Sequence, residues 1–245
     1  MKALRTGLIS IALAAASLGA SAQTTVVDFS NGTQGWTTNV NSWIDDTVGN
    51  GAPAYRTQMI DTFGLTWRNT TNAAFVGAFQ PGRSVTIGLD IEALSIQYLG
   101  NEVSRNLVVE LRDYDNTSGG YPYTSVWFNL GTISAALGMQ HFSVTIDDTS
   151  ASALPAGWGG YGEEDAFGNP VLPDGRNFAN VLAGVDEFVF TTYVPGYFYG
   201  FTNYDVVVDN ISISAVPEPS LLALHGAGLV LVGGLVRRRR HSVAR

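Results

Sequence analysis

The chain of 245 residues carries 13 lysines and arginines against 21 aspartates and glutamates, a formal net charge of −8 at pH 7. It has no cysteine, which excludes disulfides, thiol nucleophiles and thiolate zinc sites. Between residues 23 and 215 there are six arginines, no lysine and 20 acidic residues. Because nucleic-acid binding needs a basic face to neutralise phosphates, this acidic segment is not expected to bind nucleic acid.

The first residues predict a secretory signal peptide. Lys2 and Arg5 form a positive start, residues 8–18 are apolar, and Ala20-Ser21-Ala22 is a small-residue cleavage site. Cleavage after Ala22 would leave Gln23 as the mature N-terminus. Residues 1–22 are therefore expected to form a signal helix that is removed on export.

Residues 23–215 predict one all-β domain. Period-two alternation, typical of strands with one face on a core and one in water, is clearest at 84–91, 106–114 and 141–146. Further strands are expected at 25–29, 65–68, 73–79, 125–130, 187–193 and 205–214, with one helical turn at 178–182. About nine or ten short antiparallel strands indicate a β-sandwich of the jelly-roll kind, long enough to form a core without disulfides.

Three connections stand out for their length or composition. Residues 39–53 are expected to form a polar loop and 147–177 a long irregular insertion, while 193–201 is the densest aromatic stretch. Loops this long inside a compact domain are usually functional or mobile. Exposed loop aromatics are unusual without a partner, and aromatic rings stack on the apolar C–H faces of sugars.

Seven aromatic residues in predicted loops are therefore candidates for glycan binding. They are Trp43, Tyr121, Tyr123, Trp158, Tyr161, Tyr197 and Tyr199. The alternative is that these rings pack over the ends of the sandwich. Trp36, Trp67 and Trp127 lie on or beside predicted strands and are expected in the core.

The C-terminus combines a polar motif, an apolar run and a basic cluster. Pro217-Glu218-Pro219 lies before residues 221–236, which carry no acidic or basic charge apart from His225, and Arg237 to Arg240 follow. The prolines favour an extended segment. As a helix the run would span roughly 24 Å at about 1.5 Å per residue, short of a bilayer core of about 30 Å. A single transmembrane helix is still expected, because long arginine side chains can extend to the membrane interface and make up the missing length. The arginine cluster is expected to stay on the cytoplasmic side.

This tail resembles the PEP-CTERM sorting signal of bacterial exported proteins. The resemblance covers residues 216–245 and implies that a membrane-embedded exosortase is a partner. It also implies a transient anchor in the inner membrane, followed by transfer to the cell surface or extracellular matrix. A plain C-terminal membrane anchor is the alternative.

Two short segments open and close the body, residues 27–36 (VDFSNGTQGW) and residues 208–211 (VDNI). They resemble the first and last strands of galactose-binding-like jelly rolls, a group that includes carbohydrate-binding modules and laminin-B-type domains. In such modules a structural calcium joins the first and last strands, which implies Asp28, Asn31 and Asp209 as oxygen ligands. Ser30 stands where the family often has an acidic residue.

Catalytic signals are weak. The body has one histidine, His141, and no known nucleophile motif. Glu163-Glu164-Asp165 could serve a paired-carboxylate glycosidase, although adjacent acids usually form a solvated surface. The leading hypothesis is a non-enzymatic exported protein that associates with exopolysaccharide. The alternatives are a structural surface protein without a small ligand and a carboxylate-based glycan hydrolase.

Overall fold

The computed structural model describes residues 22–217. The predicted signal peptide up to residue 21, the rest of the sorting motif after Pro217 and the predicted transmembrane segment 221–236 lie outside the described residues. Within the described range, none of the helices has the length and apolar character needed to cross a membrane.

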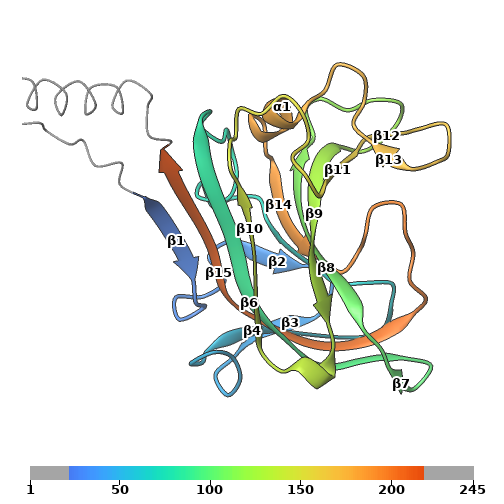
Figure 1. The fold of residues 1–245 in the computed structure, drawn as a ribbon. Coiled ribbons are helices and arrows are strands. Elements are labelled where there is room, and N and C mark those ends of the chain that lie inside the picture. The colour runs from blue at the N-terminus through green and yellow to red at the C-terminus, as the bar shows by residue number, and fades with distance from the viewer. Residues whose placement is uncertain (1–21, 218–245) are drawn as a thin grey trace, which may run out of the picture.

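Two antiparallel sheets face each other and enclose the core (Figure 1). The larger sheet has the order β10-β6-β15-β4-β3, with β1 paired to β15 and β7 paired to β6. Its strands are β1 (Gln23–Val27), β3 (Ser42–Asp45), β4 (Ala54–Thr62), β6 (Arg83–Tyr98), β7 (Asn101–Glu102), β10 (Gln140–Ile146) and β15 (Thr202–Pro217). The predicted all-β sandwich is confirmed.

The second sheet has the order β11-β9-β8-β14-β5-β2. Its strands are β2 (Trp36–Thr38), β5 (Thr66–Asn69), β8 (Arg105–Asp113), β9 (Thr124–Ile133), β11 (Trp158–Tyr161) and β14 (Glu187–Thr191). A separate hairpin pairs β12 (Glu163–Glu164) with β13 (Pro170–Val171), and a 3-10 helix η1 covers Ala135–Leu137. The predicted helical turn is α1 (Phe178–Leu182), capped at its start by Asn177 and Asn180.

The inward-facing positions of strand β15 switch once along its length, from even-numbered to odd-numbered residues. Val206 and Val208 point into the core, and strict alternation would next bury position 210. Instead Asn210 has a φ of 47°, and the register with β6 shifts there. This bulge returns Ile211 and Ile213 to the core face. One strand therefore contributes apolar residues to the core on both sides of the bulge.

Aromatic packing fills the centre of the core. The ring of Trp36 contacts Phe75 at a centroid distance of 5.2 Å, Phe190 at 5.8 Å and Phe188 at 5.9 Å. All four side chains are buried, as is that of Trp67. The prediction that Trp36 and Trp67 belong to the core is confirmed.

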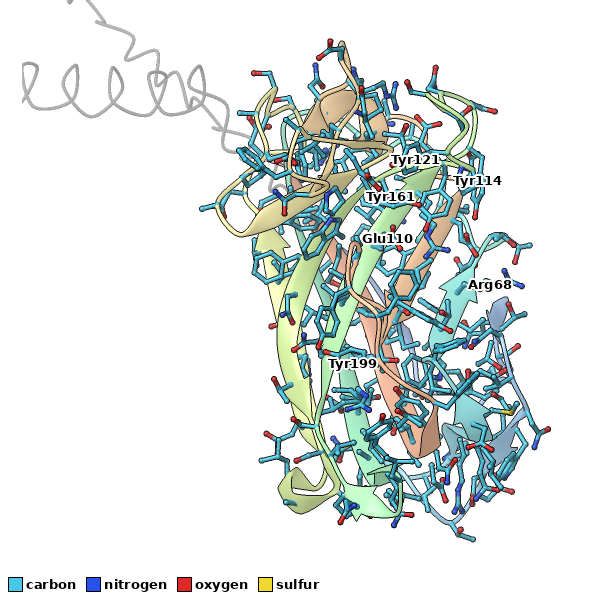
Figure 2. All side chains as sticks on the ribbon, turned by 90° about the vertical axis from the view of Figure 1, so that its right-hand side faces the viewer. Arg68, Glu110, Tyr114, Tyr121, Tyr161 and Tyr199 are labelled. Carbon is cyan, nitrogen blue, oxygen red and sulfur yellow. The ribbon has the colours of Figure 1, made fainter. Side chains whose placement is uncertain are left out.

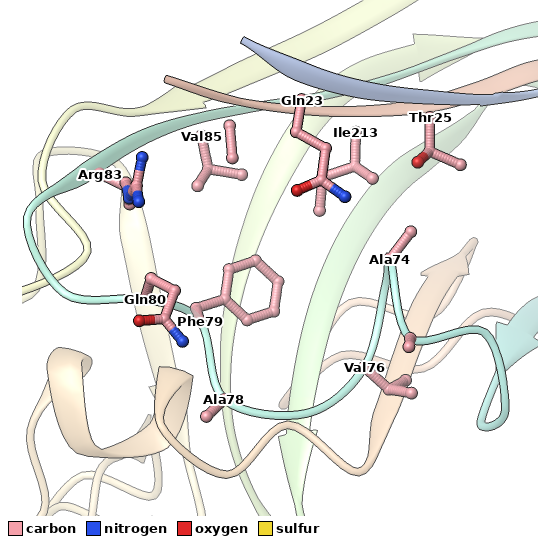
Figure 3. Close-up of a pocket in the computed structure, with 12 residues that line it drawn as sticks. Gln23, Thr25, Ala74, Val76, Ala78, Phe79, Gln80, Arg83, Val85 and Ile213 are labelled. Atoms are coloured by element: carbon pink, nitrogen blue, oxygen red, sulfur yellow. The ribbon is translucent and has the colours of Figure 1, made fainter. Parts of the chain in front are cut away.

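Residues 73–79, predicted as a strand, form no strand. Their backbone instead bonds to the connection around α1, where Gly77 N donates to Val185 O at 2.7 Å and Phe79 N donates to Leu182 O at 2.9 Å. The segment closes one side of a hollow of about 310 Å³ beneath β1, β6 and β15 (Figure 3). Hydrogen bonds to α1 and to the residues that follow it therefore replace the bonds that a neighbouring strand would have made.

Two predicted loops contain strands. Residues 39–53 include β3, which pairs with β4, and the supposed irregular insertion 147–177 includes β11 and the β12–β13 hairpin. Strand β11 reads Trp-Gly-Gly-Tyr, so its two glycines hide the alternation that would have indicated a strand. The insertion therefore supplies the edge of the second sheet.

Candidate functional site

Four tyrosines from three chain segments form a band of rings on the outer face of the second sheet (Figure 2). We call Tyr121, Tyr161, Tyr123 and Tyr114, in that order, the tyrosine band. Neighbouring ring centroids are 5.3, 5.1 and 5.4 Å apart. The fold thus unites three of the predicted glycan-binding residues with Tyr114, which the sequence reasoning did not select.

A buried ion network lies beside the tyrosine band. Arg112, in β8, donates two bonds to Glu110 Oε2, at 2.9 Å from Nε and 2.6 Å from Nη2. Its Nη1 donates to Glu187 Oε2, in β14, at 3.2 Å. Both glutamates are only 2% exposed. Alternation along β8 places Glu110 and Arg112 on the same face, and sheet register places Glu187 opposite Arg112.

Further contacts complete this network. Ser125 Oγ donates to Glu110 Oε1 at 2.6 Å, and the Tyr114 hydroxyl donates to Glu187. Arg68 Nη1 lies 3.6 Å from Glu187 Oε1 and is half exposed. The two carboxylates are therefore matched by two guanidinium groups, so this network of four side chains has no net charge.

The network also fixes the band. The Arg112 guanidinium lies 4.4 Å from the ring centroid of Tyr123, a cation–π contact. Burial of Arg112 opposes its charge, but Glu110, Tyr123 and Glu187 outweigh that effect and raise its pKa. A permanently charged arginine thus holds one ring of the tyrosine band in place.

Trp127 adds a fifth aromatic ring to this face. Predicted to be in the core, it is half-buried on the outer face of β9, opposite Glu110 and Gly159 in the ladder. A Cβ on Gly159 would lie 2.4 Å from Trp127 Cε2, so the indole covers that glycine. Its Nε1 donates to Gly160 O at 3.2 Å. The sequence carries no local signal for this placement, because it depends on the pairing of β11 with β9.

Tyr199 lies farther down the same face (Figure 2). Asn106 Nδ2 donates to its hydroxyl at 3.0 Å, and the Arg105 guanidinium lies 4.4 Å from its ring centroid. Tyr197 packs against Tyr199 edge to face at 4.9 Å. These two predicted residues therefore belong to the same sheet face but not to the tyrosine band.

The other two predicted aromatics lie elsewhere. Trp158 is 7% exposed and packs edge to face on Phe178 at 5.2 Å, so it belongs to the core and offers no surface for a sugar. Trp43 is exposed on the opposite sheet, where Arg56 lies 5.5 Å from its ring centroid. Only five of the seven predicted residues share one face.

Several carboxylates lie near this face, and three of them already have partners. Glu110 and Glu187 are both engaged by Arg112. Glu163 and Glu164 are exposed neighbours in β12, and successive strand residues point to opposite faces. Asp165 accepts N–H bonds from Phe167 and Asn169 within its own turn.

The residues predicted for calcium lie near the β15 bulge. Asp28 accepts bonds from the N–H and hydroxyl of Ser30, and Asn31 Nδ2 donates to Ser30 Oγ at 3.2 Å. Asp209 is buried and accepts backbone N–H bonds from Asn50 and Asn210. In residues 22–217 there is no group of three His, Cys, Asp or Glu side chains placed to hold a metal ion. An ion here would need amide or backbone oxygens as well.

A second carboxylate lies opposite Asp209. Asp90, in β6, accepts bonds from the side-chain amides of Asn50 and Asn210, at 3.0 and 2.8 Å, and from His141 Nδ1 at 2.7 Å. Burial raises the pKa of Asp209, and the negative charges of Asp90 and Asp28 raise it further. The N–H bonds from Asn210 and Asn50 lower this pKa but do not outweigh the other effects. This cluster is acidic, unlike the balanced network beside the tyrosine band.

The chain matches no protein-family model and no curated protein. Among solved structures, it is similar to the C-terminal family 22 carbohydrate-binding module from Clostridium thermocellum (12% identity, TM-score 0.43, 80% of this chain and 96% of that one). It is also similar to a family 11 carbohydrate-binding module from Clostridium thermocellum (13% identity, TM-score 0.40, 78% of this chain and 94% of that one). A third similar structure is an exo-β-agarase (15% identity, TM-score 0.45, 79% of this chain and 25% of that one). At these identities and TM-scores, the neighbours do not place the chain in a family.

Tyrosine titration tests the network. Burial, followed by the hydrogen bond to Glu187, raises the pKa of Tyr114 from 10.0 to about 12. Burial, followed by the charge of Glu110, also raises the pKa of Tyr123. The protonated phenols therefore stabilise the fold fully below about pH 10, and this contribution is lost as pH rises towards about 12. Tyrosinate absorbance should show late-titrating groups that titrate normally in denaturant.

Tyr114→Phe should remove one of these late-titrating groups and reduce the fall in unfolding free energy over the same pH range. Ionisation of all ten tyrosines near pH 10 in a protein that stays folded would contradict this prediction.

Proposed function

We propose that the protein is a non-enzymatic glycan-binding protein and that its ligand lies along the outer face of the second sheet. The observation that carries the proposal is the tyrosine band beside a buried, charge-balanced network. Aromatic rings offer apolar surface to the C–H face of a sugar, and the hydroxyl and guanidinium groups at their edges offer hydrogen bonds.

The charge balance favours a neutral glycan. Glu110 and Glu187 are matched by Arg112 and Arg68, so the face offers no excess positive charge to a polyanion. The surrounding body is strongly acidic, with 20 acidic residues against six arginines between residues 23 and 215. Long-range repulsion would therefore act against acidic polysaccharides.

Binding is tested by affinity electrophoresis of the full-length chain in gels containing xylan, a β-1,3-1,4-glucan or agarose. Tyr161→Ala should weaken retention on the polysaccharide that binds by about tenfold or more, because Tyr161 contacts two other rings of the band and truncating a central aromatic costs about 2 kcal/mol or more. Gly159→Ala should also weaken it, because the new methyl group displaces Trp127.

The matched control is Trp43→Ala, which removes an exposed aromatic ring from the opposite sheet and should leave retention unchanged. Equal retention of the wild type, Tyr161→Ala and Trp43→Ala would contradict the proposed face. Release of reducing ends from the bound polysaccharide that stops in Glu163→Gln/Glu164→Gln would instead identify the hydrolase. A purely structural protein would show no retention on any polysaccharide.

A structural calcium remains part of this proposal, with Asp28, Asn31 and Asp209 as ligands. Calcium that binds only the folded protein at about 100 times its Kd would add about 2.7 kcal/mol to the unfolding free energy. The melting temperature of the full-length chain should therefore be higher in calcium than in EDTA. Asp209→Asn should abolish the difference, and the exposed Asp174→Asn should preserve it. Equal melting temperatures in calcium and EDTA would exclude the ion.

We also propose export and sorting through the two terminal segments, with an exosortase as processing partner and the cell surface or extracellular matrix as destination. The order of the proline motif, apolar run and arginine cluster supports this proposal. The intact mass of native protein from cells and from medium should correspond to a chain that begins at Gln23 and ends near residues 217–219, plus any group attached there. A mass that runs through to Arg245 would leave a membrane-anchored protein.

A further inference from the structure

A second aromatic surface lies at the end of the larger sheet where β4 and β6 end and β15 begins. We call Met59, Ile60, Phe63, Tyr98, Leu99 and Phe201 the end patch; all six side chains are exposed. Strand register brings them together, since Thr62 pairs with Thr202 and Gln97 pairs with Asn203. In Figure 1 this end lies near β7, away from the end of β15 that leads to the C-terminus.

The end patch is hollowed and aromatic. Phe63 and Phe201 stack with ring centroids 4.2 Å apart. A hollow of about 330 Å³ is lined by both rings, Tyr98, Leu99 and three polar side chains, Asp61, Gln97 and Asn203. A neighbouring hollow of about 510 Å³ shares Asn203 and is lined by Met59 and Ile60. The two hollows adjoin at Asn203, and the aromatic walls belong to the first of them, which we call the groove.

Two residues at this end of the sheet, Leu99 and Asp61, have left-handed backbone conformations. Leu99 has a φ of 50° at the turn between β6 and β7 and is 80% exposed. Asp61 has a φ of 54°, and its N–H donates to Asn203 Oδ1 at 2.9 Å. Glycine or asparagine fits such turn positions with less strain. A strained, exposed leucine beside stacked aromatic rings is typical of a binding surface.

The polar groups around the end patch indicate which kind of ligand could bind there. Asp205, in the neighbouring hollow, is paired with Arg56 at 2.7 Å. Asp61 lines the first hollow, and Glu102 lies beside it, bonded to Gln97. These acidic groups would repel anionic lipid and would repel one another if two copies met through this surface. A neutral glycan fits the remaining chemistry, because rings, amides and a carboxylate together match its C–H faces and hydroxyl groups.

We propose that the end patch is a second glycan-binding site, which takes a neutral polysaccharide chain independently of the tyrosine band. The inference rests on the proposed glycan-binding function but uses no residue of that first site. Phe63 and Phe201 form the stacking surface, Tyr98 the adjoining wall, and Asp61, Gln97 and Asn203 the hydrogen-bonding groups. Tyr98 is itself held over Gly200, where a Cβ would lie 2.5 Å from its Cε2 atom.

A single NMR titration of the labelled full-length chain with xylan, a β-1,3-1,4-glucan or agarose oligosaccharides separates the two sites. The methyl groups of Ile60 and Leu99 report on the end patch, and the indole N–H of Trp127 reports on the sheet face. The inference predicts saturable shifts of both reporters. In Phe63→Ala/Phe201→Ala the methyl shifts should be lost, the indole shift should remain, and retention on the polymer should fall about tenfold or more.

Phe167→Ala is the matched control, since Phe167 is an exposed phenylalanine in the β12–β13 hairpin. Shifts of the indole alone would overturn the second site and keep the first. Shifts of the methyl groups alone would overturn the first site and keep the second. No shift with any probe would overturn both. Methyl shifts that follow protein concentration without sugar would assign the end patch to self-association and overturn the inference.

Discussion

The sandwich depends on the pairing of β15 with three other strands. β15 pairs with β1, β4 and β6, and so holds together most of the larger sheet. This long strand can serve both halves of the core only because the bulge at Asn210 resets its alternation. Without disulfides, the chain relies on such register to place each apolar side chain inward. The acidic cluster of Asp209 and Asp90 lies at that same bulge, where the ladder is interrupted.

The balance of buried charge separates the two polar clusters. Removing one partner from a buried ion pair typically costs about 3–5 kcal/mol, because the remaining charge is left unmatched. Around Arg112 each carboxylate has a guanidinium partner, so the network can fix the tyrosine band without requiring an ion. Within residues 22–217, the hydrogen-bond donors to the Asp209 carboxylate are backbone N–H groups, and Asp209 lies close to other acids. The acidic cluster at the bulge, and not the charge-balanced network beside the tyrosine band, therefore suits the cation that we propose.

The sequence alone predicts the class of fold and part of the site. Clean alternation identified the strands that became β6, β8 and β10, each with one face on the core and one in water. It failed where residue types hid the period, as in β11, whose glycines made Trp158 look like a loop residue. Trp158 and Tyr161 are three positions apart in that strand and therefore point to opposite faces.

Contacts between distant segments were beyond the reach of sequence reasoning. Glu187 joins Arg112 only because β14 pairs with β8, and Phe63 meets Phe201 only because β4 pairs with β15. Trp127 lies between two apolar neighbours, so its alternation is ambiguous until its pairing with Gly159 is known. Local patterns report which residues can form a strand, whereas a site depends on which strands become neighbours.

The direction of β15 relates the end patch to the proposed tail. Strand β15 has 16 residues and a contour of roughly 50 Å at about 3.3 Å per residue. Its first residue adjoins the end patch, and its last leads into the segment proposed as the membrane anchor. The end patch and Pro217, where the described chain ends, therefore lie at opposite ends of this strand. Because the body is strongly acidic, repulsion between copies opposes their association through this apolar surface. A neutral polymer meets no such barrier, so the acidic charge of the body does not oppose the glycan proposed for the end patch.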